Sequence, residues 1–217
     1  MNRRTLVLII SALLLAAFAA AAFFYQGATP TPQKEAAPAA QGASALVRFH
    51  SPVLGPTKAP VTIVEFFDPS CEACRAFYPP VKKILAENPS DVRLVLRYVL
   101  FHQASEEVAR LLEASRKQNL FPQVLEAVLI AQPEWHDDPK AAKAWEAATS
   151  VGLDIDKARI DMNSPAVDAV LKTDMQDVKT VGIQGTPTFF VNGQPLTEFG
   201  PEPLRQLVLS ELAKARQ

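Results

Sequence analysis

Cysteine and histidine are scarce in this chain, which has two and three of them among 217 residues. A structural zinc site needs four such ligands, and the two cysteines have no second pair to complete one. His50, His102 and His136 stand far apart in the sequence and show no ligand spacing. We therefore expect no metal ion in this protein.

The chain also lacks an excess of charge of either sign, since 22 Lys and Arg residues balance 23 Asp and Glu residues. Proteins that bind nucleic acid usually present a strongly basic face, so a nucleic-acid partner is not expected. No internal repeat is present, and 48% of the residues are hydrophobic. This length and composition suffice for one domain with a substantial core and room for an insertion.

Charged residues are absent from Thr5 to Tyr25, directly after the pair Arg3-Arg4. A basic start followed by an apolar run is typical of an export signal, and a run of this length also suffices to span a bilayer. Ala20–Ala22 offers small residues for cleavage. Residues 1–25 are therefore either a signal anchor or a signal peptide. Both readings predict a periplasmic protein, and the first also predicts a tether to the inner membrane.

Residues 26–45 are rich in proline and alanine and have few groups to bury, which predicts a disordered tether. A folded domain is expected over residues 46–217. It is predicted to begin with a strand over Val61–Phe67, whose nearly continuous apolar character suits burial on both faces. A helix from Cys71 to about Glu87 leads to a second strand over Val92–Val99, and this order predicts a parallel pair.

A helical insertion is expected over about residues 103–180. Its helices are predicted to begin near Ser105, Phe121, Asp138-Pro139, Asp156 and Ser164-Pro165, with Asp156 as the cap of the fourth. Trp135 and Trp145 are expected to pack in the core, and His136–Asp138 to form a polar loop that caps the next helix.

Strand character returns after the insertion, at Thr188–Val191. Asn192-Gly193 is a strong hairpin signal, and a short strand is expected near Pro195–Thr197. A helix that opens at Pro201 ends the chain. The predicted fold class is α/β, in the order β-α-β, helical insertion, β-β-α.

The cysteines Cys71 and Cys74 are the candidates for chemistry. Cys71 falls where a strand ends and a helix begins, and there the helix dipole and free N–H groups stabilise a thiolate. Cys74 follows one turn later, close enough to form a disulfide and to resolve a mixed disulfide. Zinc lacks further ligands, and a structural disulfide over so short a loop adds little stability. Thiol–disulfide exchange without a cofactor is the preferred interpretation.

At these residues the sequence resembles the thioredoxin superfamily and, within it, the DsbA-like branch. The resemblance extends from about Phe49 to the C-terminus. It is carried by Cys71-Glu72-Ala73-Cys74 at a helix start, the helical insertion, Gly185-Thr186-Pro187, and the closing hairpin and helix. The run His50–Gly55 is also similar to this branch. The resemblance implies a thioredoxin fold and a protein thiol–disulfide oxidoreductase.

The resemblance also implies roles for individual residues. Cys71 would form the mixed disulfide with a client protein, and Cys74 would resolve it. Pro187 matches the cis-proline that faces the dithiol in this family, and cis peptide bonds occur almost only before proline. Gly185 and Thr186 precede this proline, and Thr186 would present its backbone to the client in strand-like pairing.

Glu65 lies six residues before Cys71 in the predicted buried strand, where the family often has a buried acid. Burial raises the pKa of a carboxyl group, which can then accept the proton of the resolving thiol. The alternative is a glutamate at a strand edge that faces water. The apolar neighbours of Glu65 favour the buried, catalytic interpretation.

Glu72-Ala73 departs from the Pro-His pair of the strongest oxidants in this branch. A carboxylate beside Cys71 disfavours the thiolate, and the side chain of Ala73 has no group to stabilise it. A less stable thiolate makes a weaker oxidant, and Thr186 is by resemblance common in related isomerases and reductases. We therefore expect a protein that is less oxidising than those oxidants.

Three functions stay open. The first is disulfide exchange with cysteines of exported client proteins, with a membrane redox partner that resets the dithiol. The segment before the domain is too short and too poor in apolar residues for a dimerisation domain like that of dimeric isomerases, so a monomer is expected. The others are a peptide-binding chaperone and a copper-handling thiol protein. The intact cysteine pair argues against the chaperone, and the lack of a Met or His cluster argues against copper.

Overall fold

The structure is a computed structural model that describes residue 2 and residues 45–217. The predicted export segment, residues 1–25, lies outside the described residues except for residue 2, and so does the predicted tether except for residue 45. In the part of the chain that the structure describes, no helix is both long enough and apolar enough to cross a membrane.

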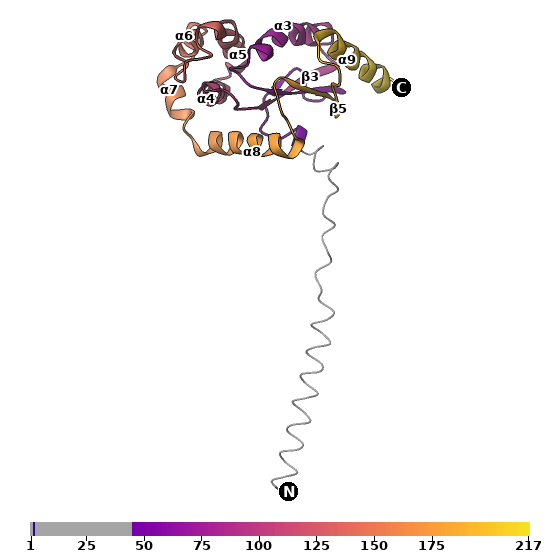
Figure 1. The fold of residues 1–217 in the computed structure, drawn as a ribbon, viewed down its shortest axis with the longest axis horizontal. Coiled ribbons are helices and arrows are strands. Elements are labelled where there is room, and N and C mark those ends of the chain that lie inside the picture. Colours follow the sequence, from indigo (N-terminus) through magenta and orange to yellow (C-terminus); the bar gives the residue numbers. More distant parts are fainter. Residues whose placement is uncertain (1, 3–44) are drawn as a thin grey trace. The chain divides into compact units, whose positions relative to one another are not determined.

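A mixed sheet lies at the centre of residues 45–217, with five strands in the order β1-β3-β2-β4-β5 (Figure 1). β2 (Val61–Phe67) and β3 (Val92–Tyr98) pair in parallel, and α3 (Glu72–Glu87) connects them. β4 (Thr188–Val191) runs antiparallel to β2 on its other side. The parallel pair and the strand at Thr188–Val191 are therefore confirmed.

Two short edge strands complete the sheet. β5 (Gln194–Pro195) pairs antiparallel with β4. Asn192 and Gly193 join them with positive φ angles of 47° and 83°, so the predicted hairpin is confirmed. β1 (Val53–Leu54) pairs antiparallel with β3 at the opposite edge. The sequence did not predict β1, because a strand of two residues is too short to show a period.

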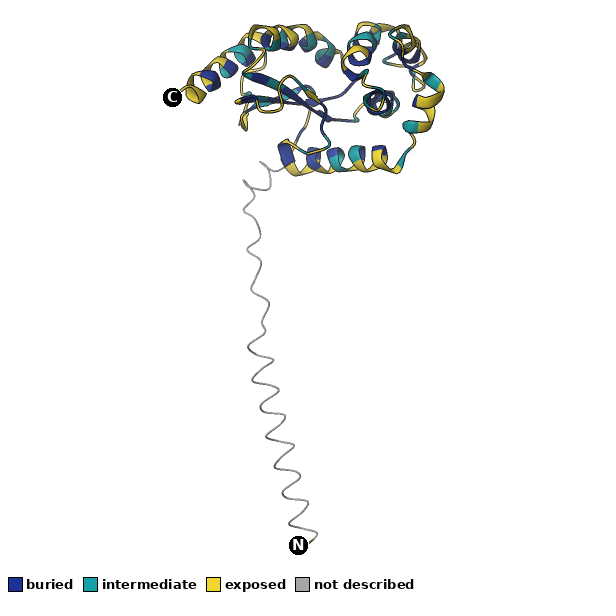
Figure 2. Ribbon diagram, turned by 180° about the vertical axis from the view of Figure 1, so that it is seen from behind, coloured by how far each residue is buried: buried dark blue, intermediate teal, exposed yellow. Residues whose placement is uncertain are grey.

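Helices cover both faces of the sheet. α3 and α9 (Pro201–Ala215) lie along one face, and α8 (Pro165–Val181) lies along the other (Figure 1). In β2, Ile63 and Phe67 belong to the core on the α3 face, while Val64 and Phe66 pack on the α8 side with Val178. Figure 2 shows the strands mostly buried and the outer sides of these helices exposed. This double cover explains why the Val61–Phe67 sequence is so continuously apolar.

The other helices lie between β3 and α8 in the sequence. They are α4 (Ser105–Arg116), α5 (Phe121–Ile130), the 3₁₀ helix η1 (Gln132–Glu134), α6 (Ala142–Ser150) and α7 (Ile155–Asp161). The helix starts predicted at Ser105, Phe121 and Pro165 are confirmed. The start predicted for α6 was wrong, and so was the cap predicted for α7.

Both errors concern which aspartate caps a helix. The Asp138 carboxylate accepts hydrogen bonds from the N–H groups of Lys140 and Ala142, so it closes a polar turn and α6 begins only at Ala142. In α7 the cap is Asp154, whose side chain accepts from the N–H of Lys157, and not Asp156. Several aspartates lie near these helix starts, and the sequence pattern does not show which of them accepts.

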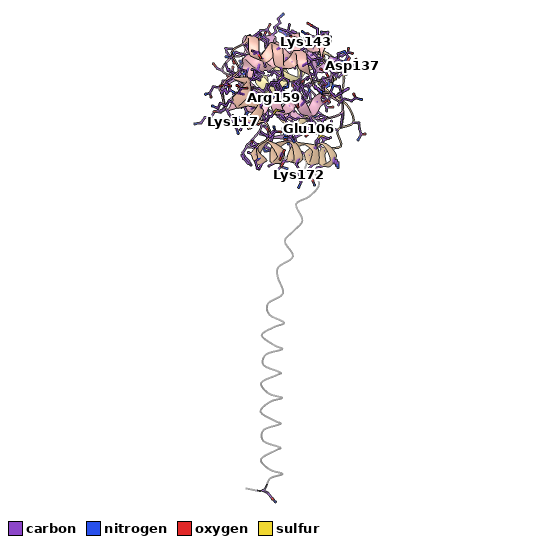
Figure 3. The ribbon with its side chains drawn as sticks, turned by 90° about the vertical axis from the view of Figure 1, so that its left-hand side faces the viewer. Glu106, Lys117, Asp137, Lys143, Arg159 and Lys172 are labelled. Atoms are coloured by element: carbon purple, nitrogen blue, oxygen red, sulfur yellow. The ribbon has the colours of Figure 1, made fainter. Side chains whose placement is uncertain are left out.

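The two tryptophans are buried, as predicted: Trp135 is 1% and Trp145 is 5% exposed. The guanidinium of Arg159 lies 3.6 Å from the centroid of the Trp145 ring and covers it from the solvent side. Figure 3 labels Arg159 together with Lys117 and Lys143, which are also exposed. The buried side chains of the insertion belong to the same hydrophobic core as the α3 face of the sheet.

A buried group of charges fixes α8 to the sheet. Arg97 of β3 is fully buried, and its guanidinium donates to Asp174 Oδ1 at 2.7 Å and to Asp177 Oδ2 at 2.6 Å. Arg97 also donates to the carbonyl oxygens of Ala45 and Leu46, which ties the start of the described domain to the same group. Buried charges of this kind are stable only when they are paired.

Candidate active site

The two cysteines lie at the junction between β2 and α3. β2 ends at Phe67, and the N–H of Ser70 donates to Asp68 Oδ1 at 2.9 Å in the turn that follows. Cys71 is the N-cap residue of α3, with an extended backbone (φ −75°, ψ 122°). Free N–H groups of the first helical turn therefore point toward its side chain, as the sequence predicts.

The two thiols have opposite environments. Cys71 is 8% exposed and Cys74 is fully buried. A hydrogen bond from the Cys74 thiol lowers the pKa of Cys71 to about 5, and Thr186 and the backbone N–H groups of Cys74 and Ala73 add to this effect. Burial and the hydrogen bond to Cys71 raise the pKa of Cys74 far above its usual range. The pair thus combines a stabilised thiolate that is slightly exposed with a protonated thiol that is fully buried.

The loop before β4 faces Cys71. The Thr186–Pro187 peptide bond is cis, as the sequence predicts, and Pro187 is buried. The Cys71 thiol donates to the carbonyl oxygen of Thr186, with 3.2 Å between Sγ and O. Gly185 is exposed, and its carbonyl oxygen accepts from the Thr188 hydroxyl at 2.7 Å. The structure therefore brings Thr186 to Cys71 and leaves Gly185 at the rim of the loop.

Glu65 is a buried acid on the same side of the sheet as the dithiol. Its residue is only 3% exposed, so the alternative of a glutamate that faces water is wrong. Burial, and in second place the charge of Cys71, raise the pKa of Glu65 to about 8. The charge of Glu65 in turn raises the pKa of Cys74, which shows that the two groups interact.

The expected effect of Glu72 on Cys71 is not found. The Glu72 side chain is 70% exposed and lies 3.9 Å from Nε2 of His136, in the insertion. The pKa of Cys71 is lowered, and backbone N–H groups, one of them from Ala73, contribute to this. The prediction gave the Glu72 side chain too much weight against the N–H groups at the start of α3, which the sequence had also indicated.

Asp68 has a structural role that was not predicted from the sequence. This residue is fully buried, and its carboxylate accepts hydrogen bonds from four groups. These are the N–H groups of Ser70 and Phe101, the Ser105 hydroxyl and Nδ1 of His102. Asp68 therefore holds the turn before Cys71 against the segment after β3. An acid placed directly after a buried strand was the signal for this role.

A second residue without a predicted role is Gln132, the first residue of η1. Its side-chain amide donates to the carbonyl oxygens of Pro69 and Cys71 at 2.7 Å and 3.0 Å. No local pattern in the sequence indicates this contact. Among residues 45–217, no group of three or more His, Cys, Asp and Glu side chains is arranged to hold a metal ion.

A family model described as thioredoxin matches residues 49–208 of the chain. Over 76% of its length the chain is 32% identical to the Na(+)/H(+) antiporter NhaA 3 of Salinispora tropica, of which it covers only 25%. The chain spans about a quarter of the length of the first curated relatives that it matches.

Two further relatives are matched over most of their length. The chain is 29% identical to the thiol:disulfide interchange protein DsbA of Bordetella parapertussis, over 73% of this chain and 76% of that protein. The crystal structure of a thioredoxin-like oxidoreductase from Silicibacter pomeroyi is similar with a TM-score of 0.68 at 28% identity, over 80% of this chain and 96% of that one.

Proposed function

Because the chain belongs to the thioredoxin family, as a DsbA-like member, we propose that it is a protein thiol–disulfide oxidoreductase that acts through Cys71 and Cys74. One observation carries the proposal: Cys71 caps α3, with its Sγ 3.2 Å from the Thr186 carbonyl oxygen and its pKa lowered to about 5. A thiolate that persists at neutral pH is the form of cysteine that attacks disulfides.

The proposed exchange begins with the Cys71 thiolate. It attacks one sulfur of a client disulfide, forms a mixed disulfide and releases the other client sulfur as a thiolate, which takes up a proton. Cys74 then gives its proton to the Glu65 carboxylate and attacks Cys71 Sγ. The second client thiolate leaves, so the client gains two electrons and two protons while Cys71 and Cys74 form a disulfide. The oxidation of a client dithiol follows the same steps in reverse.

Substrate positioning in this proposal depends on the loop at Gly185–Pro187. The backbone of Thr186 lies beside Cys71 and would pair with an extended client segment. Such pairing would bring a client sulfur to Cys71 without selecting a particular client side chain. Thiol-containing client proteins of varied sequence would therefore be accepted.

We infer that the Cys71–Cys74 couple is less oxidising than that of DsbA. The pKa of Cys71, about 5, supports this. It lies between the values of the nucleophilic cysteines of thioredoxin, about 7, and DsbA, about 3.5. A more stable thiolate makes the disulfide easier to reduce, so this intermediate pKa suggests an intermediate oxidising strength.

We also propose that the protein works outside the cytoplasm as a monomer, on cysteines of exported proteins, and that a membrane redox partner resets its dithiol. The apolar sequence Thr5–Tyr25 after Arg3-Arg4 supports export, followed by either anchoring or cleavage. Cell fractionation tests this proposal. Carbonate extraction would leave an anchored chain with the membranes, and the intact mass would show whether residues 1–25 remain. A full-length chain in the cytoplasmic fraction would contradict export.

Two single-cysteine variants form a matched pair that tests the activity. In Cys74→Ser the attacking thiolate of Cys71 remains, but no second thiol is present to resolve the mixed disulfide. A disulfide-containing client should therefore stay bound to Cys71 and be detectable by mass. In Cys71→Ser only the buried thiol remains, and no client should be trapped. Full disulfide exchange by Cys71→Ser would contradict the proposal. Suppression of client aggregation by that variant, without exchange by the native chain, would favour the chaperone alternative.

A further inference from the structure

Gln132 links the helical insertion to the turn that carries Cys71. The residue is fully buried, and its side-chain amide nitrogen donates to the carbonyl oxygens of Pro69 and Cys71. Its amide oxygen accepts from Nε of Arg75 at 3.0 Å, so the polar atoms of the side chain are all paired. These bonds join residues 61 and 63 positions apart in the sequence.

The two carbonyl groups that Gln132 binds belong to the residues on either side of Ser70. They lie in the turn Asp68–Cys71 before α3, which we call the catalytic turn. The Cys71 carbonyl oxygen also accepts from the N–H of Arg75 at 3.2 Å, the first hydrogen bond of α3. Gln132 is therefore a second donor to the residue that starts the helix. Because a peptide unit held at two points cannot easily rotate, this contact restrains the backbone from which the Cys71 side chain projects.

The same segment of the insertion approaches the catalytic turn again at Glu72. The N–H of His136 donates to the carbonyl oxygen of Gln132, and Nε2 of His136 lies 3.9 Å from the Glu72 carboxylate. The preceding helix α5 lies beside the start of α3 (Figure 1). The insertion thus contacts both the N-cap residue Cys71 and the first helical residue Glu72 of α3.

We propose that Gln132 is a positioning residue for disulfide exchange, which holds the Cys71 backbone so that its sulfur faces both the first N–H groups of α3 and Thr186. This inference rests on the function proposed above and assigns the helical insertion a part in the dithiol site. The lowered pKa of Cys71 depends in part on N–H groups of Ala73 and Cys74 and on Thr186, and is therefore sensitive to this geometry.

The test is Gln132→Met in the full chain. Methionine has a similar length and shape but cannot donate to the two carbonyl groups. Without this restraint the Cys71 sulfur should lose part of its contact with the N–H groups, so its pKa should rise by about one unit. The equilibrium with glutathione should shift about tenfold toward the disulfide, which corresponds to about 30 mV. The pKa is read from thiolate absorbance against pH, and the equilibrium from alkylation and mass.

Gln118→Met is the matched control. Gln118 lies in the same insertion and binds backbone groups 36 positions away, with its amide donating to the Asp154 carbonyl oxygen and accepting from the Asp154 N–H. These groups are not part of the catalytic turn. The control should lose some thermal stability but keep the pKa of Cys71 and the glutathione equilibrium of the native chain.

A Gln132→Met variant that keeps the native pKa of Cys71 and the native glutathione equilibrium would overturn the inference. If Gln132→Met does not fold, Gln132→Asn replaces it. Asparagine keeps a polar, uncharged amide but is too short to reach both carbonyl groups. A native pKa and equilibrium in that variant would equally overturn the inference. The proposed function fails separately, if the native chain itself shows no reversible dithiol–disulfide equilibrium.

Discussion

Replacement of Glu65 by glutamine should stabilise the reduced protein, and more so as the pH rises. The carboxyl group has a pKa of about 8 in the folded chain, against an ordinary value of 4.5. Since the folded-state value is the higher one, the native chain is most stable below pH 4.5 with respect to this group. It loses stability as the pH rises from 4.5 to about 8, because only the unfolded chain ionises freely there.

The size of this effect follows from the two pKa values. Each unit between them corresponds to about 1.4 kcal/mol, so the native glutamate costs about 3 kcal/mol at pH 7 and about 5 kcal/mol above pH 8. Glu65→Gln keeps the shape of the side chain and does not ionise. It should therefore exceed the native chain in unfolding free energy by about these amounts, with little difference at pH 4.

Urea unfolding of the reduced protein at pH 4, 7 and 9 measures the difference. Glu198→Gln is a suitable control, because Glu198 is exposed and its replacement should leave the pH dependence unchanged. The same Glu65→Gln variant should release a mixed disulfide more slowly at pH 7, since the acceptor for the Cys74 proton is gone. A stability difference that does not change between pH 4 and pH 9 would refute the reasoning.

Three further predictions concern Cys71, Thr186 and Arg97. The alkylation rate of Cys71 should be half-maximal near pH 5, whereas a midpoint above pH 8 would contradict its lowered pKa. Thr186→Val removes a side chain that lowers this pKa, so alkylation at pH 5 should slow about twofold, as a shift of roughly half a unit implies. Arg97→Met leaves Asp174 and Asp177 without their buried partner, and urea unfolding should show a loss of about 3–5 kcal/mol. A loss under about 1 kcal/mol would show that the pairing contributes little to stability.

Much of the fold could be read from local sequence patterns. Val61–Phe67 and Phe121–Ile130 were predicted with their observed bounds, because each has a strong period and clear boundary residues. The start of α6 and the cap of α7 were missed, since loop geometry, and not the neighbouring sequence, decides which aspartate caps a helix. The edge strand β1 left no pattern, because its two residues are ordered by pairing with β3.

The site could be predicted only as far as its local part. Cys71, Cys74 and Glu65 lie within ten positions of one another, so their spacing and the burial of β2 together located them. Gln132 contacts Cys71 across 61 positions, and Arg97 contacts Asp174 across 77. Such contacts are set by how the insertion and α8 pack against the sheet. Spacing along the chain therefore gives no sign of them.

The reduction potential of the Cys71–Cys74 couple is the decisive measurement for the proposed thiol–disulfide exchange. The full chain would be equilibrated in glutathione buffers at pH 7, alkylated and measured by mass. The account predicts a reversible couple between the potentials of thioredoxin, about −270 mV, and DsbA, about −120 mV. A dithiol that forms no reversible disulfide over this range would contradict the assignment of the chain as a thiol–disulfide oxidoreductase.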